Sequence, residues 1–108
     1  MTKSGKAKAV VNGTTVAEAT EWEEVEGNVY FPPSSVKSEV LEKTDLTTFC
    51  PWKGTASYYT LKVGAPADDA VDDKVENAAW YYPTPKDAAQ EIKDHVAFYK
   101  SKVTVTVE

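Results

Sequence analysis

The sequence predicts a mainly β protein of the α+β class. We expect two antiparallel sheets or a partly open barrel, with one helix in the C-terminal half and one short helix. Three observations predict this class: short apolar and β-branched runs recur along the chain, turn residues separate them, and the long alternating helices of a nucleotide-binding α/β fold do not occur. The chain of 108 residues can bury one core, so we expect a compact single domain over 1–108 with a loose N-terminus at 1–6.

The N-terminal quarter predicts a β-hairpin. Asn12-Gly13 separates the segments 7–11 and 14–19, and this dipeptide favours a two-residue turn in which both residues take positive φ. Four glutamates within 21–26 favour a solvated edge strand or ribbon, because like charges discourage pairing with another edge. Gly27-Asn28 predicts the turn that follows.

The next segment predicts a short strand and a short helix. The strand at 29–31 should end at Pro32-Pro33, because proline lacks the N–H that a strand ladder needs. Ser34 or Ser35 is the expected cap of a helix that runs to Lys43.

The central segment returns to β character at 47–50 and again at 56–63. In the second of these strands Tyr58 and Tyr59 should point to opposite faces, because side chains alternate along a strand. A polar loop at 64–73 follows it.

The C-terminal third predicts two strands around one helix. The strands are 75–82 and 103–107, the second of which alternates as a strand with one solvated face does. Thr84-Pro85 predicts the helix start, with Thr84 as N-cap and Pro85 as first helical residue. Ala88, Ile92 and Val96 would form its apolar stripe.

Charge and composition exclude several functions. The net charge is −5 and all 12 basic residues are lysine, so the guanidinium fork that suits phosphates and guanine edges is missing and we expect no nucleic-acid partner. No apolar run approaches the roughly 20 residues of a bilayer span, so we expect no membrane partner. The oligomeric state stays open.

The cysteine and histidine content is equally restrictive. One cysteine and one histidine cannot close a four-ligand zinc site, so we expect no metal, and nothing in the sequence indicates a cofactor. A lone cysteine with no secretory signal favours a reduced, cytoplasmic location.

One segment, Cys50 to Tyr59, concentrates unusual residue types. Pro51 fixes the backbone and Gly54 allows a left-handed conformation or a close approach, so a rigid bend should present Trp52 and Lys53. We expect the Lys53 ammonium to point inward, toward a cavity walled by rings from other strands. A flat ring and a cation suit a ligand that has a planar part and an anionic group. The expected ligand-binding residues are Trp52, Lys53, Gly54, Tyr58, Trp80, Tyr82 and Tyr30.

Four blocks of the chain form a recognisable pattern: Tyr30-Phe31-Pro32, Cys50-Pro51-Trp52-Lys53-Gly54-x-Ala56-x-Tyr58, Ala79-Trp80-Tyr81-Tyr82-Pro83 and Val96-Ala97-Phe98-Tyr99. In these blocks the chain resembles one uncharacterised family, catalogued as domain of unknown function 427 and sometimes labelled nucleotidyltransferase-like. The resemblance implies a compact, β-rich single domain and no established reaction. The chain departs from the family pattern at His95, where the family often has glycine, and it carries no phosphate-cradling glycine loop.

The candidate catalytic residues are Lys53 and Cys50, and each also has a purely structural interpretation. Lys53 is a binding or catalytic amine, or a loop lysine that caps carbonyl groups. Cys50 is a nucleophile or, more in keeping with its residue type, a buried thiol. His95 near the expected helix end is better explained by local electrostatics than by catalysis.

The remaining candidates are groups of carboxylates and rings. The aspartates in 68–73 match no standard calcium loop and fit a solvated acidic loop. One of Glu23, Glu24 and Glu26 is a candidate carboxylate for a pocket, with an exposed edge as the alternative. The rings of Tyr30, Trp80, Tyr82 and Phe98 either belong to the core or line a pocket.

Three functions follow as hypotheses. The first is a small-molecule pocket for an anionic or aromatic ligand around the Cys50–Gly54 segment. The second is a transferase or hydrolase that uses Lys53 with an acid–base partner. The third is a protein–protein interaction module that uses exposed aromatic anchors.

Overall fold

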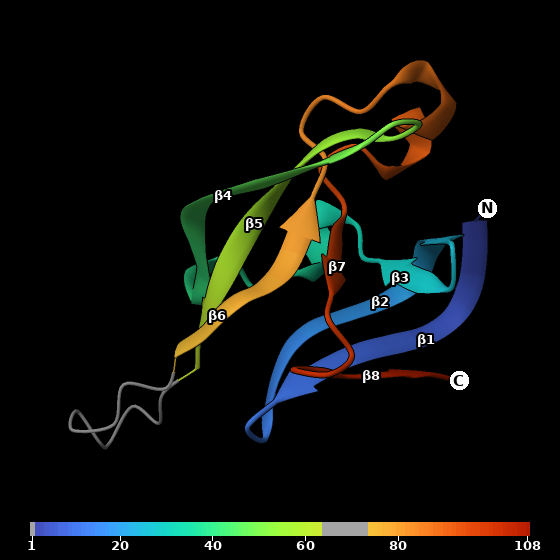
Figure 1. Cartoon of the computed structure of the whole chain (residues 1–108). Helices are drawn as coiled ribbons and strands as arrows, with labels where there is room; N and C mark the ends of the chain where they lie inside the picture. The colour runs from blue at the N-terminus through green and yellow to red at the C-terminus, as the bar shows by residue number, and fades with distance from the viewer. Residues whose placement is uncertain (1, 64–73) are drawn as a thin grey trace.

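The computed structural model describes residues 2–63 and 74–108 (Figure 1), and within them eight strands are joined by turns and three short 3-10 helices. The strands are β1 (Thr2–Val11), β2 (Thr14–Val25), β3 (Asn28–Tyr30), β4 (Leu41–Cys50), β5 (Gly54–Lys62), β6 (Lys74–Tyr81), β7 (Val96–Phe98) and β8 (Thr104–Val107). The helices are η1 (Pro33–Ser35), η2 (Ser38–Val40) and η3 (Asp87–Ile92). The predicted mainly β class is confirmed, and none of the short helices could cross a membrane.

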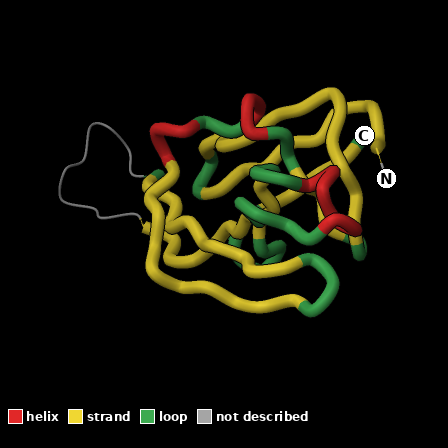
Figure 2. The backbone as a smooth tube through the Cα atoms, turned by 90° about the horizontal axis from the view of Figure 1, so that it is seen from above, coloured by secondary structure: helices red, strands yellow, loops and turns green. Residues whose placement is uncertain are grey.

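The strands form two four-stranded sheets, in the orders β3-β2-β1-β8 and β4-β5-β6-β7, and every pairing is antiparallel. Phe31 and Val96 join the sheets, since each backbone N–H donates to the carbonyl of the other at 2.8 and 2.9 Å. Viewed from above, the strands run around most of the molecule (Figure 2). The result is a curled half-barrel with β4 and β8 at its outer edges.

The first hairpin confirms the turn prediction. Asn12 and Gly13 have φ of 50° and 77°, the left-handed pair that a two-residue hairpin turn requires. Its strands are longer than expected, because Thr2–Ser4 pair with Glu21–Glu23. Residues 2–6, expected to be loose, therefore begin β1.

The glutamate-rich segment is not an edge strand, which corrects that prediction. It is the end of β2, which pairs with β1 on one side and with β3 on the other. A central strand of a sheet can carry charges on a solvated face, so charge alone did not distinguish the two positions. The turn also shifts by one residue: Val25 pairs with Asn28, so Glu26-Gly27 makes the turn.

The short helix expected from Ser34 or Ser35 to Lys43 is replaced by η1, η2 and the start of β4 at Leu41. Val36 adopts an extended conformation between the two 3-10 turns and forms a bridge with Ala17 of β2. This tertiary pairing competes with a helix for the same backbone groups.

The C-terminal helix is also only a 3-10 segment. Lys86, not Thr84, precedes η3, no side chain caps it, and Ala89 departs from helical geometry at φ −126°. Ala88 is exposed, so the expected apolar stripe does not form, whereas Ile92 is buried. The tertiary contact that competes is the Lys86 N–H, which donates to the carbonyl of Lys53 at 2.9 Å.

The core has two parts, and the alternation at Tyr58 and Tyr59 separates them as predicted. Tyr59 packs on the cluster between the two sheets, where Phe31 and Phe98 meet edge to face at 5.6 Å. Tyr58 belongs to a second cluster, which η3 helps to cover. That second cluster comprises Tyr30, Ala56, Tyr58, Trp80, Tyr82, Ala89, Ile92 and Ala97.

Candidate ligand-binding site

The predicted bend is the turn of the β4–β5 hairpin. Cys50 pairs with Gly54, so Pro51, Trp52 and Lys53 form the turn between them. Gly54 has φ of 111°, a conformation that residues with a side chain rarely adopt. A Cβ at this position would lie at ordinary contact distance from the 84–86 segment, 3.4 Å from the carbonyl oxygen of Thr84, so the φ, not a clash, is what requires glycine here.

Lys53 points inward from this turn, as the sequence predicted. The residue is only 7% exposed, and its ammonium donates a hydrogen bond to the carboxylate of Glu26. The Nζ atom also lies 5.3 Å from the ring centre of Trp52 and 5.5 Å from that of Tyr82. Lys53 therefore has a charged partner and two aromatic faces around one cation.

Glu26 lies on the turn between β2 and β3, so two hairpin turns meet at this ion pair. Its φ of 54° is left-handed, a conformation that asparagine or glycine adopts more readily than glutamate. The Glu26 side chain is 52% exposed, in contrast to the 9% of the Lys53 side chain. A buried cation is thus balanced by a carboxylate that solvent can reach.

The ion pair shifts both pKa values toward the charged forms. Burial opposes the charge on Lys53, but the hydrogen bond that Lys53 donates to Glu26, together with nearby Tyr30, Tyr82 and the Glu26 charge, outweighs it and raises the Lys53 pKa. The hydrogen bond and charge of Lys53 lower the Glu26 pKa, with a small contribution from Trp52. At neutral pH the amine is a poor nucleophile and the carboxylate a weak base, so the pair is suited to binding more than to proton transfer.

Tyr82, whose ring centre lies 5.5 Å from the Lys53 Nζ atom, belongs to a packed aromatic wall with Tyr30 and Trp80. Trp80 donates its Nε1–H to the hydroxyl of Tyr30 at 3.2 Å, and the two rings meet edge to face with centres 6.2 Å apart. Tyr82 is 5% exposed, and its burial raises its pKa although Lys53 acts in the opposite direction. Tyr30, Trp80 and Tyr82 are therefore all buried members of the second core cluster.

Tyr58 points toward a different set of partners. Its hydroxyl lies 3.0 Å from Thr48 Oγ1 and 3.2 Å from the hydroxyl of Tyr99. The structure thus brings Trp52, Lys53 and Tyr82 together, while Tyr58 lines a separate hollow with Tyr99.

The other candidates have local explanations. Cys50 is a free, half-buried thiol beside the second cluster. His95 Nδ1 lies 2.9 Å from the carbonyl of Lys93, and Phe98 belongs to the core between the sheets. No group of three metal-ligating side chains occurs in residues 2–63 and 74–108, and the aspartates of 68–73 lie outside the described residues.

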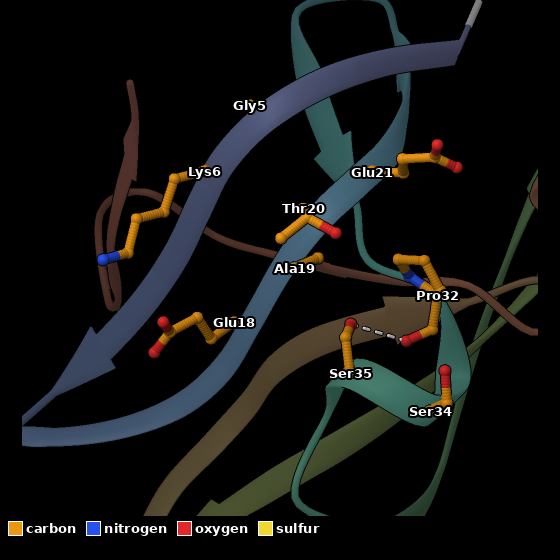
Figure 3. Close-up of a pocket in the computed structure, with 9 residues that line it drawn as sticks. All are labelled: Gly5, Lys6, Glu18, Ala19, Thr20, Glu21, Pro32, Ser34 and Ser35. Atoms are coloured by element: carbon orange, nitrogen blue, oxygen red, sulfur yellow. Dashed lines mark hydrogen bonds between the residues drawn. The ribbon is translucent and has the colours of Figure 1, made fainter.

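Five surface hollows, two of them of about 830 and 420 Å³, lie elsewhere on the described part of the molecule, and Lys53 lines none of the five. One, of about 830 Å³, lies between the curved part of the β1–β2 hairpin and η1, where Ser35 Oγ donates to the carbonyl of Pro32 (Figure 3). Its lining is Gly5, Lys6, Glu18, Ala19, Thr20, Glu21, Pro32, Ser34 and Ser35. The other, of about 420 Å³, includes Tyr58. Neither is lined by Lys53 or Trp52.

Sequence reasoning left two parts of this region undetermined. It placed Glu26 among three glutamates without choosing one, although Glu26-Gly27 after a strand is a possible turn signal. It did not connect Tyr99 with Tyr58, because their contact joins residues 41 positions apart.

The fold and site define a class of protein: a two-sheet β domain in which two hairpin turns share a lysine–glutamate ion pair against an aromatic wall. The chain belongs to the family described as domain of unknown function (DUF427), whose model matches residues 2–108. No curated protein matches the chain.

Proposed function

We propose that the chain binds a small molecule that carries an anionic group and a flat apolar part, at the Lys53–Glu26 pair. The observation that carries the proposal is the asymmetry of this pair. The Lys53 side chain is 9% exposed and the Glu26 side chain 52% exposed. A carboxylate or phosphate of a ligand would take the place of the Glu26 carboxylate at the ammonium.

The backbone of Glu26 supports an exchangeable role. The Glu26-Gly27 turn requires the left-handed φ of Glu26, but asparagine or glycine suits that position better, so turn geometry does not explain why a glutamate stands there. Solvation of the released carboxylate costs little, because much of its surface already faces water.

Trp52 supplies the surface for the flat part of the ligand. The residue is 40% exposed, and it lies beside Lys53 on the same turn. An exposed ring next to a buried cation can stack on an aromatic or apolar group whose anion reaches inward.

The test is a titration of the ¹⁵N-labelled chain with phenyl phosphate, compared with the neutral compound benzyl alcohol. Phenyl phosphate should shift the backbone amides of Glu26 and Trp52, and Lys53→Met should abolish those shifts. Glu26→Gln keeps an oxygen acceptor but removes the competing charge, so it should tighten binding by about tenfold, equal to about 1.4 kcal/mol.

The matched control is Lys37→Met, which removes an exposed lysine outside the site. It should leave binding unchanged. Equal binding of phenyl phosphate by the parent and by folded Lys53→Met protein would contradict the proposal, as would weaker binding by Glu26→Gln.

A protein–protein interaction module is the second candidate, and one observation favours it. Phe49 is 65% exposed and Trp52 40% exposed, so the β4–β5 turn presents two aromatic side chains. Light scattering after size-exclusion chromatography tests self-association: this candidate predicts an oligomer that Phe49→Ser converts to a monomer.

A further inference from the structure

A second hollow, of about 420 Å³, lies away from Lys53. It spans three strands and the segment that follows β7. Its lining residues are Leu46 of β4, Tyr58 of β5, Asn77 of β6, and Tyr99, Ser101 and Lys102. A volume of this size is sufficient for a one-ring ligand. We propose that this hollow binds a small aromatic carboxylate, with its ring against Leu46 and Tyr99 and its carboxylate toward Lys102 and the tyrosine hydroxyls.

Two exposed apolar surfaces supply the binding face for the ring. Leu46 is 42% exposed and Tyr99 is 38% exposed, although both are large hydrophobic side chains. Two neighbouring rings support the Tyr99 ring: its centre lies 4.7 Å from the ring centre of Trp80 and 6.3 Å from that of Tyr58. A ring in this position presents a preorganised face, so little side-chain entropy is lost on binding.

The hydroxyl groups of Thr48, Tyr58 and Tyr99 form a hydrogen-bonded chain in which one O–H donor is left unused. Three hydroxyls carry three protons, and the contacts Thr48–Tyr58 and Tyr58–Tyr99 use one proton each. The described residues offer these hydroxyls no further partner. One O–H is therefore available to an acceptor group, such as a carboxylate oxygen.

Lys102 supplies the positive charge. Its Nζ atom lies 5.8 Å from the ring centre of Tyr99 and donates to the carbonyl of Glu76 at 2.9 Å. An ammonium has three protons, so donors remain after this one bond. The cation thus lies over the Tyr99 ring and lines the same hollow as that ring.

The donor groups match a carboxylate better than a cation. Tyr99 stays protonated in the physiological range, because its hydrogen bond with Tyr58 and its burial raise its pKa to about 12. Hydroxyls that keep their protons and a lysine together favour an acceptor with negative charge.

Benzoate is the probe, with benzyl alcohol as the neutral comparison, in a titration of the ¹⁵N-labelled full chain. Benzoate should shift the backbone amides of Tyr99, Ser101 and Lys102. The shifts should persist in Lys53→Met, which separates this hollow from the site proposed at Lys53.

Three variants test the named contacts. Tyr99→Phe removes one hydroxyl and should weaken benzoate binding by about fivefold. Leu46→Ala, at an exposed position where folding is not at risk, and Lys102→Met should each weaken it by a similar factor. The matched control Lys100→Met removes a lysine that donates to the carbonyl of Gly27 and does not line the hollow, so it should bind benzoate as the parent does.

Amide shifts at Tyr99–Lys102 that Leu46→Ala and Lys102→Met weaken, and Lys100→Met does not, support the proposal. The proposal is overturned if millimolar benzoate shifts none of these amides. It is equally overturned if benzyl alcohol binds as well as benzoate, or if Lys102→Met and Lys100→Met bind equally.

Discussion

The Lys53 ammonium and the Glu26 carboxylate come from two different hairpin turns, 27 residues apart in sequence, and meet in one ion pair. The pair links the two sheets at a point away from the Phe31–Val96 bridge. It is therefore a tertiary contact as well as a candidate binding site, and stability measurements can separate the two roles.

Removal of Glu26 and removal of Lys53 should not cost the same free energy of unfolding. Glu26→Ala leaves the Lys53 ammonium buried without its counter-charge, and we expect a loss of about 1–3 kcal/mol. Lys53→Met replaces the buried charge by an apolar chain of similar length, so a change below about 1 kcal/mol is expected. Urea unfolding of both single variants and the double variant provides the measurement. A Lys53→Met loss as large as that of Glu26→Ala would contradict this interpretation.

The pair also predicts how stability depends on pH. The Glu26 pKa is lowered from 4.5, so its contribution is present above pH 4.5 and is lost as the pH falls through the lower folded value. The Lys53 pKa is raised from 10.5, so its contribution is present below pH 10.5 and is lost as the pH rises through the higher folded value. Urea midpoints at a series of pH values should show both losses. In Glu26→Gln the loss of stability at acidic pH should be smaller than in the parent protein. An equal loss in both proteins would contradict a stabilising role of the ion pair.

The Tyr99 hydroxyl should lose its proton only at high pH, and its pKa should depend on Tyr58. The hydrogen bond with Tyr58 and burial raise the Tyr99 pKa to about 12. Tyr58→Phe removes that hydrogen bond, and the Tyr99 pKa should fall toward the ordinary value of 10.0. NMR of ¹³Cζ-labelled tyrosine follows each ring separately. Tyr59, whose pKa burial and Tyr81 raise to about 12, is the internal control and should not move.

Gly54 should tolerate substitution less well than Gly13. Alanine at Gly54 must adopt φ of 111°, well outside the left-handed region near about 57°, so we expect a loss of about 2–3 kcal/mol. Gly13 has φ of 77° with nothing within 4 Å of an added Cβ, and Gly13→Ala should cost about 1 kcal/mol. Thermal unfolding of the two variants compares them. Equal losses would show that the Gly54 backbone is no more strained for alanine than the Gly13 backbone.

Some features were determined by the sequence alone because they depend on neighbouring residues. The Asn12-Gly13 turn follows from the backbone freedom of two adjacent residues, and the opposite faces of Tyr58 and Tyr59 follow from strand geometry. The inward direction of Lys53 was also anticipated from the proline and glycine around it. Trp52 and Tyr82 do place their ring centres 5.3 and 5.5 Å from the Lys53 Nζ atom, and Tyr30 is close enough to act on the Lys53 pKa.

Tertiary structure decided the rest, because distant groups competed for the same backbone and side-chain atoms. The Thr84-Pro85 signal predicted a helix, but the Lys86 N–H donates to the Lys53 carbonyl and the segment forms a short 3-10 turn. The choice of Glu26 among three glutamates, and the contact between Tyr58 and Tyr99, likewise depend on which turns and strands meet in space. Local sequence patterns do not predict which distant residues come into contact. The chain between two such residues can adopt many conformations that differ little in local energy.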